Sequence, residues 1–349
     1  MSAAVSVVIP VHNGAAWLDR VLAAIESQGY DAPLEIIAVE DGSTDSSREI
    51  LKRHAAAGRV TLIDGPHRGV AAALNAGIRA ATHPLIAQID QDVVIAPGWL
   101  NHLVAPFDDA AVAAAQGHYV AATEAGPWSR VMGLDLGLRY RALGDWTNHV
   151  CTGNSIYRKS ALLEAGLFDE ALGYAADNDM SYRLTDAGYM LAFCPQARST
   201  HYWREGLFNY ARQQYGFGYG RLDLLAKHRG RRVTGDDVSR VMMMLHGPVM
   251  AAALAMGVTA LVLAVTGGPA RIPALTAATL LAVLVTERVV AGLRAALAFR
   301  DPAGLWFAPA HLTRDIAWVA AILVWTTRRA AGAGSRPSDS MKPRTPGTA

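Results

Sequence analysis

The chain has 349 residues, 52% of them hydrophobic, and a formal net charge of +2 at pH 7. A charge so close to zero gives no indication of nucleic acid as a partner. Two cysteines, Cys151 and Cys194, cannot build a disulfide framework, so we expect a reducing environment for the folded part. The amino terminus lacks the basic and apolar stretches of a secretory signal, and we expect the first domain to stay in the compartment where it is made.

The first hundred residues alternate between short apolar runs and amphipathic stretches. Strands are predicted at residues 5–10, 34–39, 60–64 and 85–90, and helices at 15–28, after Ser43 and at 71–81. This alternation predicts an α/β fold with a mostly parallel sheet covered by helices on both faces. Ligands of such sheets bind beyond the carboxyl ends of the strands. That rule places three polar pairs on one edge: His12–Asn13, Glu40–Asp41 and Asp90–Asp92.

Asp90 and Asp92 form an Asp-x-Asp pattern at the end of a predicted buried strand. Two carboxylates this close repel each other unless a cation lies between them. Mg²⁺ or Mn²⁺, bound by one or two carboxylates and by substrate phosphates, suits such a pair. The pattern alone is also common in solvated turns, and its place after an apolar strand is what favours a metal site.

Four sequence blocks stand in a characteristic order: VSVVIPVHN (5–13), VEDGSTDSS (39–47), RGVAAALNAG (68–77) and the Asp-x-Asp. Their order and spacing resemble the family-2 glycosyltransferases of the GT-A fold, which transfer a sugar from a nucleoside-diphosphate sugar with inversion. This chain has Glu40 where the family usually has a first Asp. The resemblance implies that Asp92 is the principal ligand of the metal that contacts the diphosphate. It also implies a set of residues that bind the nucleotide-sugar: Pro10, His12, Asn13, Asp41, Gly69, Asn75 and Asp90.

The stretch 152–191 resembles the acceptor side of the same family. Asp177 matches the position of the catalytic base, although the acid that usually precedes it is Ala176 here. Asp179 is the rival for this role, and either acid could instead cap the helix that follows. His201 follows another predicted strand and, by the resemblance, completes the metal site with Asp90 and Asp92; a packing or surface role is equally expected of a lone histidine.

Beyond the predicted GT-A domain (residues 1–204) the composition changes. Residues 205–240 mix aromatic and basic side chains, which predicts a helical segment at the membrane interface, with an ordinary helical subdomain as the alternative. Residues 241–330 form an apolar region that predicts two or three membrane helices. Its third stretch contains His311, Arg314 and Asp315, so we expect that stretch to be tilted, interfacial or part of a bundle. The Gly-, Ser- and Pro-rich residues 331–349 are expected to be disordered.

Basic residues flank the apolar region on both sides, at 227–232 and at 328–344. The positive-inside rule then predicts a multi-pass protein of the inner membrane, with both flanks and the catalytic domain in the cytoplasm. Two crossings with an interfacial third segment satisfy this rule, and three do not.

The sequence therefore predicts a membrane glycosyltransferase that uses Mg²⁺ or Mn²⁺, with a nucleoside-diphosphate sugar, a lipid-linked or other glycan acceptor and membrane lipids as partners. The segment 212–217 lacks the Arg-Trp of processive relatives, so the chain is more similar to non-processive, succinoglycan-type enzymes of exopolysaccharide assembly. A catalytically silent protein that binds nucleotide-sugars is the main alternative. A nucleotidyltransferase is disfavoured because PVHNGAAWL (10–18) has no basic loop, and a transporter because the predicted soluble domain is too large. The donor sugar, the base and the acceptor stay open.

Overall fold

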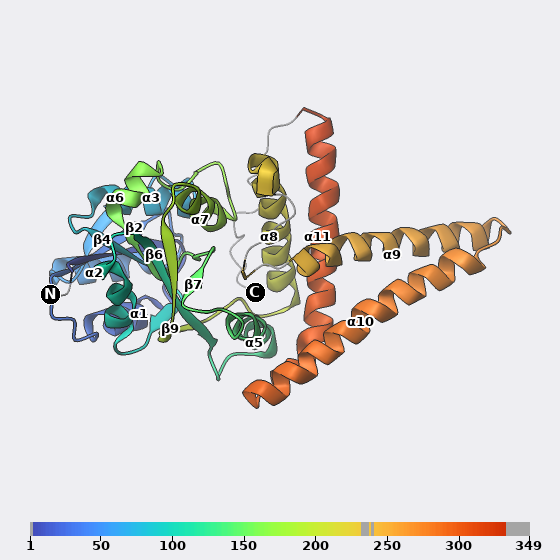
Figure 1. The fold of residues 1–349 in the computed structure, drawn as a ribbon, viewed down its shortest axis with the longest axis horizontal. Helices are drawn as coiled ribbons and strands as arrows, with labels where there is room; N and C mark the ends of the chain where they lie inside the picture. The colour runs from blue at the N-terminus through green and yellow to red at the C-terminus, as the bar shows by residue number, and fades with distance from the viewer. Residues whose placement is uncertain (1–2, 232–236, 239–240, 333–349) are drawn as a thin grey trace.

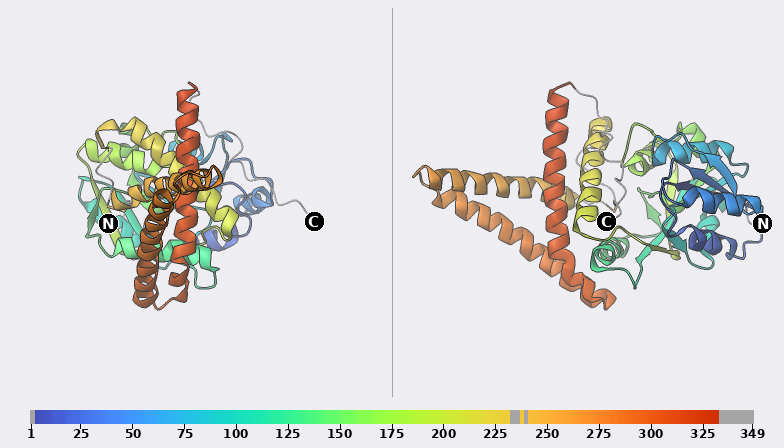
Figure 2. Two further views of the ribbon diagram at one scale, coloured as in Figure 1. Left: turned by 90° about the vertical axis from the view of Figure 1, so that its right-hand side faces the viewer. Right: turned by 180° about the vertical axis from the view of Figure 1, so that it is seen from behind.

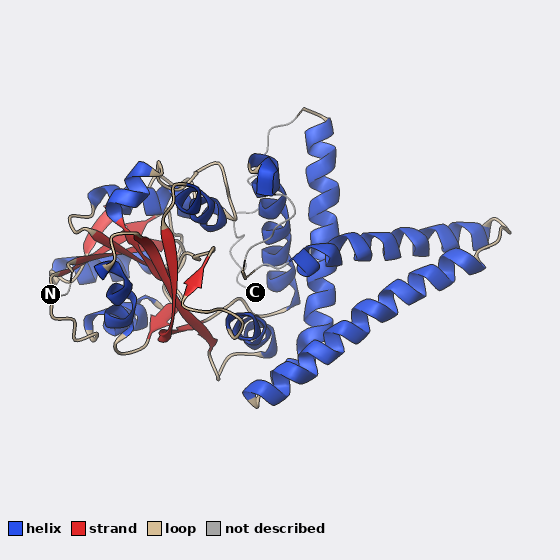
Figure 3. Cartoon of the chain, viewed as in Figure 1, coloured by secondary structure: helices blue, strands red, loops and turns tan. Residues whose placement is uncertain are grey.

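A computed structural model describes residues 3–231, 237–238 and 241–332 of the chain. Its amino-terminal part, which we call the sheet domain (residues 3–204), is a layered α/β unit (Figures 1 and 3). Four long helices follow the sheet domain. The predicted disordered tail lies outside the described residues, apart from residues 331–332.

The sheet contains nine strands, and the order of eight of them is β3-β2-β1-β4-β8-β6-β9-β5, while β7 pairs with β9. Strands β1 to β4 pair in parallel, as the alternating pattern predicts, whereas β8 is antiparallel to both β4 and β6. The sheet is therefore parallel at its amino-terminal half and mixed beyond it. The strands are β1 (Val5–Val11), β2 (Leu34–Glu40), β3 (Thr61–Asp64), β4 (Leu85–Ile89), β5 (Val93–Ile95), β6 (Val112–Ala121), β7 (Trp146–Thr147), β8 (Asn154–Arg158) and β9 (Met190–His201).

Helices cover both faces of this sheet. The helix α1 buries Leu18, Val21, Leu22 and Ile25, the positions that repeat at helical spacing, and it begins at Leu18 because residues 14–17 form a turn. With α4 it packs on one face, while α3, α6 and α7 pack on the other. The helices of the domain are α1 (Leu18–Glu26), α2 (Ser47–Ala56), α3 (Val70–Ala80), α4 (Trp99–Val104), α5 (Pro127–Tyr140), α6 (Lys159–Glu164) and α7 (Ala176–Asp186).

The remaining helices are α8 (Leu207–Lys227), α9 (Val241–Val265), α10 (Arg271–Phe299) and α11 (Phe307–Ala330). Figures 1 and 2 show α9 and α10 as a hairpin that projects away from the sheet domain, while α11 runs across this hairpin and lies beside α8. Three helical segments of the described chain are long and apolar enough to cross a membrane: Met243–Val265, Arg271–Phe299 and Pro302–Ala330.

The charges of the third apolar stretch are buried inside the helical region. The Arg288 guanidinium lies 2.8 Å from the Asp315 carboxylate, and Arg314 contacts the same carboxylate at 3.4 Å. Asp135 of α5 lies 3.7 Å from both His311 and Arg314. These charges therefore pair with one another and with Asp135 of the sheet domain, so their burial is compensated.

Helix α8 turns only part of its aromatic and basic surface outward. Tyr210 and Tyr219 are buried, whereas Phe208 is 86% exposed. Lys227 forms ion pairs with Asp169 and Asp179 of the sheet domain. The exposed Phe208 is consistent with the predicted segment at the membrane interface. Lys227 does not support that prediction, because it contacts the sheet domain.

Candidate active site

The loops after β1, β2 and β4 meet at the carboxyl edge of the sheet. Val11, the last residue of β1, is paired with Glu40, the last residue of β2, so the two strands end level. Pro10 lies buried inside β1, one residue before its end, where it is paired with Val39. The polar pairs that follow these strands are therefore brought to one place.

Asn13 joins the first two of these loops. Its backbone is left-handed, with φ of 57°, and its main-chain N–H donates to the Ser43 hydroxyl at 3.0 Å. Its side-chain oxygen accepts from the Thr44 N–H at 2.7 Å. The Asn13 side chain is thus engaged in shaping this loop.

Asp41 has a comparable role in the loop at residues 67–69. One of its carboxylate oxygens accepts from the His67 N–H at 2.6 Å and the other from the Gly69 N–H at 3.0 Å. Gly69 has φ of 96°, which favours glycine at this position. Each carboxylate oxygen can accept a second hydrogen bond, so Asp41 can order this loop and still contact a ligand.

Gln91, between the two acids of the Asp-x-Asp, was not among the residues that sequence reasoning singled out. Its side-chain oxygen accepts from the His12 N–H at 2.7 Å, and its amide nitrogen donates to the His12 carbonyl at 2.9 Å. A Cβ at Gly14 would lie 2.6 Å from the Gln91 side chain, so glycine leaves the space that this pairing needs. Only the position of Gln91 between two candidate ligands could have drawn attention to it.

Asp92 and His201 are brought together by the pairing of β5 with β9, in which Val93 lies opposite His201. The His201 Nε2 atom is 3.4 Å from an Asp92 carboxylate oxygen. Burial works to raise the pKa of Asp92, but His201, a main-chain hydrogen bond and Arg204 together outweigh it and the pKa is lowered. Burial and the negative charge of Asp92 together raise the pKa of Asp90 to about 7. Of the two neighbouring carboxyl groups, Asp92 therefore ionises readily and Asp90 only at a higher pH.

These residues fit a divalent cation. A cation beside them would relieve the repulsion that raises the pKa of Asp90, and an imidazole with carboxylates is a suitable donor set for Mn²⁺. The buried Nδ1 of His201 has no hydrogen-bond partner among the described residues. Among the residues that the structure describes, no group of three Asp, Glu, His or Cys side chains could hold a metal ion by itself. The remaining ligands would come from substrate phosphates, as is usual for Mg²⁺.

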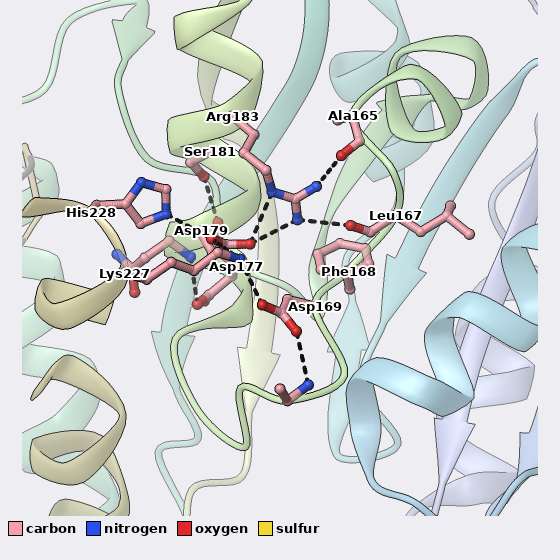
Figure 4. Close-up of polar contacts among 12 residues, drawn as sticks. Ala165, Leu167, Phe168, Asp169, Asp177, Asp179, Ser181, Arg183, Lys227 and His228 are labelled. Carbon is pink, nitrogen blue, oxygen red and sulfur yellow. Dashed lines mark hydrogen bonds and ion pairs between the residues drawn. The ribbon is translucent and has the colours of Figure 1, made fainter. Parts of the chain in front are cut away.

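Asp177 and Asp179 have different surroundings at the start of α7 (Figure 4). Asp179 is fully buried and forms ion pairs with Arg183, Lys227 and His228. The Asp177 carboxylate accepts a hydrogen bond from the adjacent Asn178 N–H, and its charge contributes to the raised pKa of Asp90. The Asp177 charge therefore acts on Asp90, whereas the Asp179 carboxylate is taken up by Arg183, Lys227 and His228.

Asn75 lies in α3 and is buried, with 2% of its surface exposed. Its side chain accepts from the Phe168 N–H and donates to the Phe168 carbonyl, both at 2.9 Å, and it also donates to Glu170 at 3.1 Å. These partners belong to the segment that leads to α7, not to a donor loop. Any influence of Asn75 on the donor pocket is therefore indirect.

Comparisons with known proteins agree on one family. Residues 6–166 match the family described as Glycosyl transferase family 2. A pre-mycofactocin glycosyltransferase of Mycobacterium tuberculosis is 31% identical over 234 residues, which are 64% of this chain and 48% of the relative, so the chain spans about half of that protein. An uncharacterized glycosyltransferase of Mycobacterium bovis is 34% identical over 172 residues, 49% of this chain and 75% of the relative. A succinoglycan biosynthesis protein of Rhizobium meliloti is 27% identical over 234 residues, 64% of this chain and 70% of the relative.

The fold also resembles that of a solved enzyme. A mannosyltransferase from Pyrobaculum calidifontis, in complex with GDP-Man and Mn²⁺, superimposes with a TM-score of 0.59. The superposition covers 93% of this chain and 88% of the mannosyltransferase, at 21% sequence identity.

Proposed function

Since this chain belongs to glycosyl transferase family 2 and has the GT-A fold, we propose that it transfers a sugar, with inversion, from a nucleoside-diphosphate sugar to an acceptor hydroxyl. The observation that carries this proposal is the meeting of the loops after β1, β2 and β4 at the carboxyl edge of the sheet, with Asp92 3.4 Å from His201 at the same edge. Asp90 and Asp92 suit the diphosphate end of the donor, and Asp177 suits the acceptor.

The donor binds where the loops at residues 12–14, 41–45 and 67–69 meet. Their hydrogen bonds to one another fix the loop shapes before a ligand arrives, so little ordering cost remains for binding. The base and ribose occupy this side, with Asp41 using its remaining acceptor capacity. The diphosphate extends toward Asp90 and Asp92.

Asp92 and His201 would hold Mg²⁺ or Mn²⁺, with Asp90 beside them. When bound, such an ion supplies positive charge next to the leaving diphosphate. The protein's own residues fix the ligand positions: the pairing of β5 with β9 sets the distance between Asp92 and His201.

Asp177 is the proposed general base. Inverting transfer needs the acceptor hydroxyl to lose its proton as it attacks the anomeric carbon, and a positioned carboxylate contributes ~10²–10⁴-fold to such a step. Asp179 is a poor candidate because Arg183, Lys227 and His228 already occupy its carboxylate.

The helices suggest how the enzyme meets its membrane. Helix α9 has 25 residues. At 1.5 Å per residue it is about 37 Å long, enough to cross a hydrocarbon core of about 30 Å. Exposed leucines and valines run along α9 and α10, as expected of a pair that crosses. Helix α11 buries His311, Arg314 and Asp315 on one side and exposes Ile316, Leu323 and Val324 on the other. We therefore place α11 along the cytoplasmic membrane surface, with α9 and α10 as the two crossings.

An acceptor at this surface would be a lipid-linked or other glycan, and the similarity to a succinoglycan biosynthesis protein favours a non-processive role in polysaccharide or glycolipid synthesis. The alternative of a silent nucleotide-sugar binder is motivated by Ala176, which replaces the usual acid, but the presence of Asp41, Asp90, Asp92 and Asp177 opposes it.

The test is a screen of the purified full chain with UDP-glucose, UDP-galactose, UDP-N-acetylglucosamine and GDP-mannose in Mn²⁺. We expect one donor to raise the unfolding temperature and to be hydrolysed slowly in the absence of acceptor. Stabilisation with neither hydrolysis nor transfer to any acceptor extract would favour the silent binder. No stabilisation by any nucleotide-sugar would refute both.

A further inference from the structure

The carboxylate of Asp179 joins α7 to the carboxyl end of α8 (Figure 4). One of its oxygens lies 2.7 Å from the Lys227 ammonium and 2.7 Å from the His228 Nε2. The other lies 2.8 Å from the Arg183 guanidinium. Since Asp179 is completely buried, these contacts replace all of its hydration and fix its position.

Two of these cations also hold the segment that leads to α7. Arg183 donates to the carbonyls of Ala165 and Leu167, the latter at 2.7 Å. Lys227 lies 2.6 Å from the carboxylate of Asp169 (Figure 4). The end of α8 is thus bonded both to α7 and to the segment in front of it.

A second contact between α8 and this segment involves no charge. Gly216 and Gly220 lie one turn apart on α8, and a Cβ at either position would overlap Tyr174. The ring of Phe217 meets that of Tyr174 edge to face, with 5.6 Å between their centroids. On α8, Gly218 faces Trp318 of α11 instead. Helix α8 is therefore packed between α11 and the Tyr174 segment.

Asp177 lies between these two attachments, three residues after Tyr174 and two before Asp179. Ala175, between Tyr174 and Asp177, has φ of 64°, a conformation that alanine adopts only when its surroundings enforce it. The surroundings that can enforce it are the packing of Tyr174 on α8 and the Asp179 ion pairs.

We propose that α8 positions the Asp177 carboxylate through Lys227, His228 and its glycine face (Gly216 and Gly220). Sugar transfer then depends on the position of α8 against α7, while donor binding does not. This inference rests on the proposed role of Asp177 as the base. Lys227 and Tyr174 are then positioning residues, because they act through Asp177 and its loop. A misplacement of about 1 Å at a reacting group can cost ~10²-fold in rate, so small shifts of α8 suffice.

The test uses the full chain with the donor that it hydrolyses fastest in the screen of four nucleotide-sugars. Lys227→Met keeps the aliphatic stem and removes the ion pairs with Asp169 and Asp179. We expect kcat to fall about 10- to 100-fold while the KM for the donor and the affinity for its nucleoside diphosphate change less than about twofold. Lys227→Arg should restore most of the activity. Arg229→Met removes an exposed cation two residues further on and should leave kcat unchanged.

A second variant avoids the charges. Gly220→Ala introduces a methyl group against Tyr174 and should give the same separation of kcat from donor affinity. If one variant does not fold, as judged by its thermal transition, the other decides. Unchanged kcat in a folded Lys227→Met or Gly220→Ala chain overturns the inference.

A double-mutant cycle distinguishes positioning of the base from a general weakening of the fold. In the Asp177→Asn background the base is absent, so Lys227→Met should lower the residual rate by less than about twofold. A full 10-fold further loss in that background would mean that α8 acts elsewhere, and the inference would be wrong. If the unmodified chain turns over none of the four donors, the proposed function itself fails, which is a different result from active enzyme with an indifferent Lys227.

Discussion

Gln91 and His12 are joined by two reciprocal hydrogen bonds, of 2.7 and 2.9 Å, between the side-chain amide of the first and the main chain of the second. This pairing ties the Asp-x-Asp to the loop after β1, although 79 residues separate the two positions in sequence. Gln91 lies between Asp90 and Asp92, so its hydrogen bonds to His12 fix the position of these two acids relative to the loop after β1.

Replacing Gln91 should weaken donor binding more than catalysis. Each hydrogen bond contributes a net ~0.5–1.5 kcal/mol, so Gln91→Ala should raise the donor KM about tenfold with kcat changed far less. Gly14→Ala should act in the same way, because its methyl group would collide with Gln91. The check is the steady-state kinetics of Gln91→Ala, Gly14→Ala and the double variant. If the two increases in donor KM add in the double variant, the two substitutions do not act through the same Gln91–His12 pairing. Gln196→Ala, at an exposed position of β9, is the control.

Asp177→Asn should lower turnover by ~10²–10⁴-fold and leave donor affinity nearly unchanged, because it removes the base and keeps the shape. Asp179→Asn should lower stability as well as turnover, since a neutral amide cannot satisfy the cations of Arg183 and Lys227, and breaking a buried ion pair costs ~3–5 kcal/mol. Unfolding temperature and kcat measured on both variants separate the roles. Loss of turnover in Asp179→Asn without loss of stability, with Asp177→Asn active, would reverse them.

Asn75→Ala should destabilise the chain and slow transfer without weakening nucleotide binding. The variant leaves the buried N–H and C=O of Phe168 without their amide partner, at a cost of ~1–3 kcal/mol for each unsatisfied group. Chemical denaturation measures the first effect, and titration with UDP or GDP the second. A tenfold loss of nucleotide affinity would instead support the direct contact implied by the family resemblance.

Much of the donor side follows from sequence because strand order and loop position are local properties. The apolar runs predict β1 to β4, and parallel strands bring His12, Asp41 and Asp90 to one edge whatever the details of packing. The partners of Asn13 and Asp41 could not be predicted in this way. They depend on loop conformations such as the left-handed Asn13, which a motif does not specify.

The resemblance favours Asp177 over Asp179 as the base, but the different surroundings of the two acids could not be predicted from the sequence. Both acids lie in the first turn of α7, and periodicity treats them alike. What separates them is the arrival of Lys227 and His228 from α8, nearly fifty residues later in the chain. Asp135, which lies 3.7 Å from Arg314, is a similar case, since hydropathy shows a charge in an apolar stretch but not its partner in α5.

Divalent metal should be required, and its binding should strengthen as the pH rises. EDTA or Asp92→Asn should abolish transfer, and full activity in excess EDTA would exclude the metal site. The raised pKa of Asp90 means that the folded chain holds this proton more tightly than the unfolded chain does, between the ordinary value of 3.8 and about 7. The stability contributed by protonated Asp90 is therefore lost as the pH rises through this window.

Two measurements check this sign. The metal-free unfolding temperature should fall from about pH 4 to about pH 7 more steeply in the unmodified chain than in Asp90→Asn. Stabilisation by Mn²⁺ should increase over the same range, because the ion binds ionised carboxylates. A pH dependence that is identical in Asp90→Asn would assign the effect to other groups.

The membrane arrangement predicts opposite locations for two insertions. A reporter after Ala349 should be cytoplasmic, whereas one in the turn between α9 and α10, at Gly267–Gly268, should lie across the membrane. Deleting the chain from Val241 should release it from membranes or leave it bound only through α8. Leu323→Glu on the exposed side of α11 should weaken attachment of α11 to lipid without removing the protein from the membrane. A C-terminal reporter on the far side would require three crossings.

The glycine face of α8 has a consequence for the order in which the protein matures during synthesis. Residues 3–204 emerge from the ribosome first, and the hydrogen bonds that shape the donor loops all lie within them. The packing site of Tyr174 is incomplete until α8 has been made. Helix α8 itself packs against Trp318, which is translated about a hundred residues later. Domains generally fold as they emerge. The newly made chain would thus be able to hold a nucleotide-sugar well before it can transfer the sugar, and activity would begin only once the membrane helices are in place.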